Sequence, residues 1–123
     1  IRDRGNLMMN IYSSASIVLN AIGTKVGGIA GGGTATNSFF TGDVSANATS
    51  THVGPIVGDN ARTVNNNYYS TSTILTNATN TNATGTAATS TFYDKNNAPL
   101  SSWDFNNVWQ ENPGDYPSLQ TEY

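Results

Sequence analysis

The single histidine of the chain, His52, restricts the catalytic chemistry that the sequence can support. A serine triad would have to combine it with a carboxylate such as Asp43 or Asp59, yet the sequence contains no Gly-x-Ser-x-Gly elbow. The His-Glu-x-x-His pair of zinc peptidases is absent, and the glycine-rich run 27–33 lacks the Lys-Ser/Thr and the helix of a phosphate loop. We therefore expect His52 to be a turn residue and assign no catalytic residue.

Carboxylates offer a second kind of chemistry, because pairs of acids cleave polysaccharides and groups of acids bind calcium. Asp43 and Asp59 fall in different parts of the repeat described below, so they are not expected to converge. The later acids Asp94, Asp104 and Asp115 lie within two residues of Asn or Gly, in turn contexts where acids commonly cap backbone amides. The sequence therefore predicts no metal site and no cofactor.

Aromatic side chains near the C-terminus offer a third kind of chemistry. Trp103, Trp109, Tyr93 and Tyr116 could stack on sugar rings, which makes them candidate glycan-binding residues. The same residues could instead cover the end of a repeat array, where open strand edges and apolar core need a terminal unit of different composition. Both interpretations remain open from the sequence, and the second is the commoner use of such residues.

Composition limits the partners of the chain. Its net charge is -3 and only 11% of its residues are charged, so it lacks the basic surface that grips nucleic acid. No apolar run approaches the roughly 20 residues that span a bilayer, so we expect no membrane insertion. The absence of cysteine removes disulfides and thiolate metal sites. Abundant Thr and Asn beside 12 Gly indicate strands and turns rather than helices.

A repeat organises the first 70 residues. The stretch VGGIAGGG from Val26 returns 27 residues later as VGPIVGDN from Val53. The same spacing relates NIYSSASIVLN from Asn10 to NSFFTGDVSAN from Asn37, and a third copy starts at Asn66 after two inserted residues. Equivalent side chains would then stack at the strand spacing of about 4.8 Å. The expected ladders are Asn10, Asn37 and Asn66; Tyr12, Phe39 and Tyr68; Val26 and Val53; and Ile29 and Ile56.

This periodicity predicts an all-β fold, a right-handed parallel β-helix (solenoid) of about three to four coils with a C-terminal aromatic cap. We expect one domain over 1–123, forming the C-terminal part of a larger protein. Its parts would be repeat coils at 1–70, an exposed Thr/Asn-rich excursion at 71–91 and a capping segment at 92–123. Edge pairing through residues 1–25 would allow end-to-end self-association.

The motifs resemble the GLUG-motif repeats of bacterial secreted and surface proteins. The Gly-Leu-hydrophobic-Gly core of that family is similar to Gly28-Ile29-Ala30-Gly31 and to Pro55-Ile56-Val57-Gly58. Its following phrase resembles the residues from Asn37 to Val44, and its tryptophan-rich ending resembles the segment from Trp103 to Leu119. The resemblance implies an extracellular β-helical, adhesin-like region, also found beside the catalytic domain of some immunoglobulin A peptidases, and it brings no catalytic motif to this chain.

The repeat and the absence of catalytic motifs predict a non-catalytic structural or adhesive module, and the resemblance implies that it belongs at the bacterial cell surface or in the extracellular medium. It would act as a rigid spacer or as a region that contacts a host glycan or protein, with the remainder of a larger chain N-terminal to it. The alternative is the terminal part of a β-helical polysaccharide-active enzyme.

Overall fold

The computed structural model describes residues 7–20, 25–59, 64–79, 83–98 and 100–120. Its strands are two or three residues long, and two short 3-10 helices lie near the C-terminus. Val, Ile, Phe, Tyr and Thr fill many of the strand positions, while Gly, Asn and Ser dominate the links. Such strands are short because residues with turn preferences interrupt the chain every few positions.

Four sheets contain only parallel strands. The first has the order β1 (Leu7–Met9), β5 (Thr34–Thr36), β9 (Val64–Asn65). The second has the order β12 (Gly85–Ala87), β10 (Tyr68–Ser70), β6 (Phe39–Phe40), β2 (Tyr12–Ser13). The third has the order β11 (Leu75–Thr76), β7 (Val44–Ser45), β3 (Ile17–Val18), and the fourth pairs β4 (Val26–Gly27) with β8 (Val53–Gly54).

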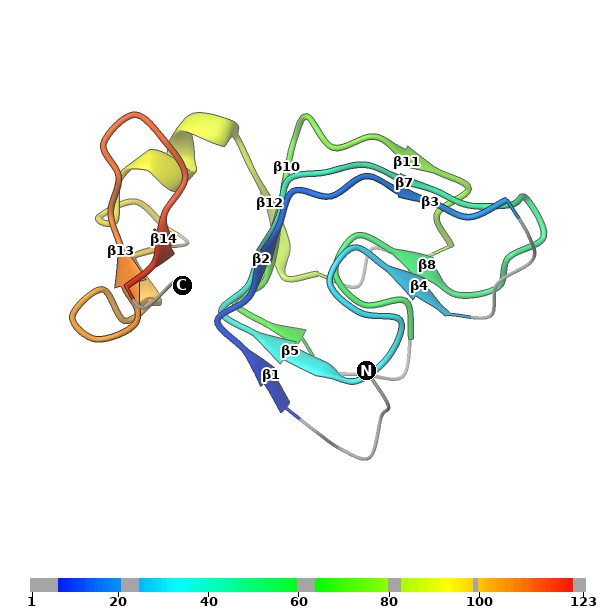
Figure 1. Cartoon of the computed structure of the whole chain (residues 1–123), viewed down its shortest axis with the longest axis horizontal. Coiled ribbons are helices and arrows are strands. Elements are labelled where there is room, and N and C mark those ends of the chain that lie inside the picture. The colour runs from blue at the N-terminus through cyan, green and yellow to red at the C-terminus, as the bar shows by residue number, and fades with distance from the viewer. Residues whose placement is uncertain (1–6, 21–24, 60–63, 80–82, 99, 121–123) are drawn as a thin grey trace.

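The chain visits these sheets in a constant order, so that equivalent strands lie beside one another (Figure 1). We call β1 to β4 the first pass, β5 to β8 the second pass and β9 to β11 the third pass. Strand β12 then adds one more strand to the second sheet beyond β10. Each pass is thus paired with the next one through backbone hydrogen bonds.

The residues of the expected ladders lie in register. Tyr12 and Tyr68 both pair with Phe39, and Val26 pairs with Val53. The Ile29 N–H donates to the Ile56 carbonyl at 3.0 Å. The repeat spacing of 27 residues therefore coincides with the register of the first two passes.

Asparagine makes the corner between the first two strands of each pass. Asn10, Asn37 and Asn66 follow the strands of the first sheet and have φ values of 57°, 51° and 54°. This left-handed conformation suits Asn better than other residues with a Cβ. The Asn66 amide also donates from Nδ2 to Asn37 Oδ1 at 3.2 Å, which links the second and third passes.

The expected right-handed parallel β-helix with three to four coils is wrong. The strands form five separate small sheets of two to four strands, and no closed or solenoid sheet is present in the part of the chain that the structure describes. The fifth sheet is antiparallel and pairs β13 (Trp109–Gln110) with β14 (Ser118–Leu119). Pairing stops after two or three residues because the Asn corners and the glycine-rich links turn the backbone.

Strand β6 separates two apolar clusters. Phe40 belongs to the main core, with Val44, Val53, Ile56 and Val57. Phe39 points to the opposite face and belongs to a second cluster that contains Phe92, Leu100, Trp103 and Trp109. Successive side chains of a strand point to opposite faces, so these two adjacent phenylalanines bury both faces of one sheet.

The position of the C-terminal segment corrects the expected aromatic cap. This segment contains η1 (Thr89–Tyr93), η2 (Leu100–Ser102), β13 and β14. It lies beside the sheet that contains β2, β10 and β12, on the side of the Phe39 cluster (Figure 1). It therefore covers a sheet face rather than the end of the stacked passes, because the aromatic column Tyr12–Phe39–Tyr68 belongs to the face turned away from the main core.

The Thr/Asn-rich segment 71–91 is partly built into the sheets. It supplies β11, which pairs with β7, and β12, which pairs with β10. Thr79, between these two strands, donates its N–H to the Val53 carbonyl and accepts the Val53 N–H at Oγ1. This threonine therefore continues the fourth sheet beyond β8.

Candidate functional site

The aromatic cluster around Phe39 brings together the four residues that the sequence offered as a glycan platform. The ring centroid of Phe39 lies 6.0 Å from that of Trp103, 5.8 Å from that of Trp109 and 5.6 Å from that of Tyr116. The ring centroids of the two tryptophans are 4.9 Å apart, and the Tyr93 ring meets the Tyr116 ring edge-on with 5.7 Å between their centroids. The four residues therefore form one contiguous group with Phe39 at its base.

The four residues differ in how much of each side chain is exposed to water. Trp103 is 5% exposed and Trp109 is fully buried, whereas Tyr93 and Tyr116 are half-buried. A ring stacks on a sugar only through a face that water can reach. The tryptophans are thus placed to fix the C-terminal segment against the sheet, and the two tyrosines remain as the candidate contact residues.

Among the residues that the structure describes, the buried indole nitrogens of Trp103 and Trp109 have no hydrogen-bond partner. An unsatisfied buried donor costs about 1–3 kcal/mol. Burial of a tryptophan ring removes a large apolar area from water, and this gain offsets that cost. The indoles therefore contribute apolar bulk and not polar recognition.

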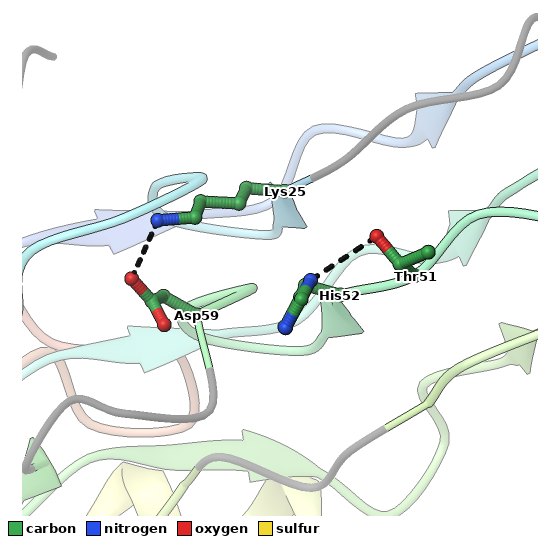
Figure 2. Close-up of polar contacts among 4 residues, drawn as sticks. All are labelled: Lys25, Thr51, His52 and Asp59. Carbon is green, nitrogen blue, oxygen red and sulfur yellow. Dashed lines mark hydrogen bonds and ion pairs between the residues drawn. The ribbon is translucent and has the colours of Figure 1, made fainter.

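A second group of polar residues surrounds the start of β4 and β8 (Figure 2). Lys25 donates from Nζ to Asp59 Oδ2 at 2.7 Å, and His52 Nδ1 lies 3.1 Å from Thr51 Oγ1. The His52 carbonyl accepts the N–H of Val26, which fixes the two passes in register. His52 therefore lies in the link directly before β8, and Asp59 is engaged in an ion pair with a lysine.

The described acids all accept hydrogen bonds that hold the chain in place. Three of them bond to a backbone N–H within three residues along the chain, which is typical of turn capping: Asp94, Asp104 and Asp115. Two bond to a more distant backbone N–H: Asp43 to Ile74 and Glu111 to Lys95. Asp59 pairs with Lys25. Each carboxylate thus has a structural partner.

Asp104 shows the electrostatic effect of such a partner. The N–H of Asn107 lowers the pKa of this carboxyl below its ordinary value, and the Asn107 side-chain amide and the Asn106 N–H act in the same direction. Hydrogen bonds to the charged form of an acid stabilise that form. The turn at Asp104 in the C-terminal segment therefore favours the ionised form of this carboxyl.

No pocket is present among the residues that the structure describes. Within the same residues, no three His, Cys, Asp or Glu side chains gather closely enough to hold a metal ion. None of the described helices has the length and apolar character needed to cross a membrane.

The sequence interpretation missed a buried polar chain at the corner between the first and second sheets. The N–H of Ile11 donates to Ser38 Oγ, that of Ser38 to Asn67 Oδ1, and that of Asn67 to Thr84 Oγ1, at distances of 3.0–3.2 Å. Ser38 and Asn67 are fully buried. The sequence offers one signal for this chain, because Ser38 and Asn67 directly follow the corner residues Asn37 and Asn66. The signal is weak because the residue type at this position differs from one pass to the next.

Comparison with known proteins adds no relative to this description. No protein-family model matches the chain, and the searches of curated proteins and of solved structures find no match.

Proposed function

We propose that this chain is a non-catalytic structural or adhesive module of a bacterial secreted or cell-surface protein, related to the GLUG-motif repeats. It would act as a rigid spacer or as a region that contacts a host glycan or protein, joined at its N-terminal side to the remainder of a larger chain. One observation supports this proposal most strongly: the side chains that could do chemistry have structural roles instead. The described acids form hydrogen bonds or an ion pair within the fold, and both tryptophans pack against Phe39.

The glycines of the repeat phrases have a packing role that fits a structural module. A Cβ at Gly28 would overlap the Pro55 carbonyl oxygen and the Phe40 ring. A Cβ at Gly42 would overlap the Ala15 carbonyl oxygen. These glycines permit close approach of neighbouring passes, which fits a structural module.

The contact region that best fits an adhesive role is formed by Tyr93 and Tyr116. Both rings are half-buried and meet edge-on, which leaves part of each ring accessible. A sugar ring could stack on such a surface through its C–H groups. This argument applies to the two tyrosines and leaves out Trp103 and Trp109.

A glycan array tests the contact role. Wild type, Tyr93→Ala and a control, Ile74→Ala, would be compared; Ile74 is an exposed hydrophobic residue outside the aromatic cluster. A signal that Tyr93→Ala loses and Ile74→Ala keeps supports a glycan-contact region. A signal that persists in Tyr93→Ala contradicts the assignment of this surface, and no signal at all leaves the spacer role as the proposal.

A turnover assay tests the non-catalytic part. The chain would be incubated with a panel of plant, bacterial and animal polysaccharides, and the release of reducing ends would be measured. We expect no release above the buffer control. Reproducible turnover that Asp43→Asn or Asp59→Asn abolishes would contradict the proposal and favour the polysaccharide-active alternative.

A further inference from the structure

The chain contains the same short motif three times. Asn-Ala-Thr begins at Asn47, Asn77 and Asn82, and each copy matches the Asn-x-Ser/Thr signature of N-linked glycosylation. In a chain rich in Asn and Thr such matches arise by chance, so the motif alone does not identify an acceptor. The structure describes every residue of the first two copies, and these two copies differ in how their side chains are used.

The first copy forms an exposed turn in the link between β7 and β8. The Ser50 N–H donates to the Asn47 carbonyl at 2.9 Å, which closes the turn, and Ala48 and Thr49 at its tip are exposed. The link lies at the end of the molecule opposite the C-terminal segment, so that segment does not cover it (Figure 1). An exposed surface turn of this kind has room for a bulky, hydrophilic modification.

The side-chain amide of Asn47 is fixed through its oxygen and not through its nitrogen. Asn47 Oδ1 accepts the Thr49 N–H at 3.0 Å and the Thr49 hydroxyl at 2.8 Å. Within the residues that the structure describes, Asn47 Nδ2 donates no hydrogen bond. This nitrogen is the atom that accepts a sugar in N-linked glycosylation. It is therefore available for reaction while the amide is held in one orientation.

The two donors of Thr49 also favour reaction at this nitrogen. Attack of Nδ2 on the anomeric carbon of a glycosyl phosphate forms the N–C bond and breaks the C–O bond to phosphate. The electron pair of the broken bond leaves with the phosphate oxygen, and a proton of Nδ2 passes to a base of the transferring enzyme. Loss of this proton places negative charge on Oδ1, and hydrogen bonds aimed at a developing charge stabilise it.

The second copy has the same three residues in a different arrangement. Asn77 Nδ2 donates to the Ala46 carbonyl at 2.8 Å. The Thr79 N–H donates to the Val53 carbonyl at 3.0 Å, and Thr79 Oγ1 accepts the Val53 N–H at 2.8 Å. Asn77 and Thr79 are both exposed, so exposure does not distinguish the two copies. Their hydrogen bonds do, because these three bonds would have to break before an enzyme could take up Asn77 and Thr79 together.

We propose that Asn47 is an N-glycosylation site of the folded chain, with a glycosyl phosphate as the sugar donor, and that Asn77 is not. The contrast between two identical tripeptides carries this inference: one presents its amide nitrogen on an exposed turn, and the other uses it to hold the third pass against the second. The inference goes beyond the function proposed above and does not depend on it.

Two glycosylation reactions test the proposal on the folded chain. One supplies an oligosaccharide on a lipid pyrophosphate together with an oligosaccharyltransferase, and the other supplies a nucleotide-diphosphate hexose together with a soluble N-glycosyltransferase. Every chain carries Asn82→Gln, which removes the third copy. Peptide mass spectrometry follows each site, because trypsin cleaves after Arg62 and so separates Asn47 from Asn77. Modification of Asn47 in either reaction supports the proposal, and the added mass identifies the donor.

The fold is expected to determine which asparagine reacts. In the folded chain, modification should be at least about tenfold faster at Asn47 than at Asn77, because three hydrogen bonds restrain the second copy. A tryptic digest prepared before the reaction is the control, since it frees both tripeptides from the fold, and both asparagines should react at similar rates in it. Thr49→Val keeps the side-chain shape and the backbone N–H but removes the hydroxyl, so it should abolish modification at Asn47 in a chain that circular dichroism shows to be folded.

Four results would overturn the proposal. The first is a folded chain that neither reaction modifies at Asn47. The second is a folded chain that is modified equally fast at Asn47 and Asn77. The third is a digest that keeps the preference for Asn47, because the flanking sequence and not the fold would then cause it. The fourth is a folded Thr49→Val chain that is modified as fast as the chain with Thr49.

Discussion

Replacement of Phe39 by alanine is expected to release the C-terminal segment from the sheet. Phe39 is 1% exposed and contacts five rings at centroid distances of 5.3–6.0 Å: Tyr12, Phe92, Trp103, Trp109 and Tyr116. Its neighbour Phe40 belongs to the other cluster. The two clusters can therefore be perturbed one at a time through adjacent positions of a single strand.

The expected loss of unfolding free energy in Phe39→Ala follows from the burial of this side chain and from its ring contacts. Truncation of a buried phenylalanine to alanine costs about 3–5 kcal/mol of unfolding free energy. Aromatic pairs add about 0.5–1.5 kcal/mol each, but contributions within one cluster are not additive. We therefore expect a loss of about 4 kcal/mol, which is a large part of the roughly 5–15 kcal/mol that stabilises a typical domain.

Urea unfolding with two probes measures this loss. Trp103 and Trp109 both lie in the C-terminal segment, so tryptophan emission reports on that segment, whereas far-ultraviolet circular dichroism reports on the whole chain. In Phe39→Ala the emission transition is expected at a lower urea concentration than the dichroism transition. Phe39→Leu, which keeps most of the apolar volume, is the control and is expected to lose much less.

Two outcomes would refute this reasoning. The first is a loss below about 1 kcal/mol in Phe39→Ala, since a buried ring cannot be removed so cheaply from a packed cluster. The second is a pair of transitions that shift together by the same amount, because Phe39 would then support the main core instead of the attachment of the segment.

Three further outcomes are expected. Asn37→Ala should lower the free energy of unfolding by about 1–2 kcal/mol, because alanine disfavours the φ of 51° and the hydrogen bond from the Asn66 side-chain amide is lost. Asn37→Gly should lower it by less, and equal losses for the two variants in urea unfolding would contradict the role of the left-handed corner. Gly28→Ala should lower the free energy of unfolding by about 3 kcal/mol or more in the same assay, because the added Cβ overlaps Pro55 and Phe40. Gly114→Ala, which has open space around it, should lower it by about 1 kcal/mol through its φ of 80° alone. The pKa of the Asp104 carboxyl is lowered in the folded state, so this carboxylate stabilises the fold above its unfolded-state pKa, and the stabilisation disappears as the pH falls through its folded-state pKa. Asp104→Asn should therefore flatten the acidic part of a plot of melting temperature against pH, and an unchanged slope would contradict this contribution.

The pairing of the passes could be inferred from the sequence because like residues recur at the spacing of the paired strands. Tyr12, Phe39 and Val26, Val53 are examples in which the side-chain type is kept along the register. The architecture could not be inferred in the same way. A spacing states which segments are neighbours, but the length of each strand depends on where Asn and Gly turn the backbone, and here strands end after two or three residues.

The site shows a similar division. Aromatic clustering near the C-terminus indicated that Trp103, Trp109 and Tyr116 belong together, but not which sheet face they cover. A strand as short as β6 has no alternating pattern, so Phe39 and Phe40 cannot be assigned to opposite faces from their sequence. The polar chain through Ser38 and Asn67 was hidden because its members share a position and not a residue type.

The attachment of the C-terminal segment also governs how the outermost strand can open. Strand β12 runs almost directly into η1, and the aromatic residues that follow rest on Phe39, which belongs to the second pass. Fraying of β12 would pull on these rings, so the strand cannot peel away without releasing the segment behind it. The amide hydrogens of β12 should therefore exchange with solvent together with those of the segment, as one cooperative unit rather than as a loose end.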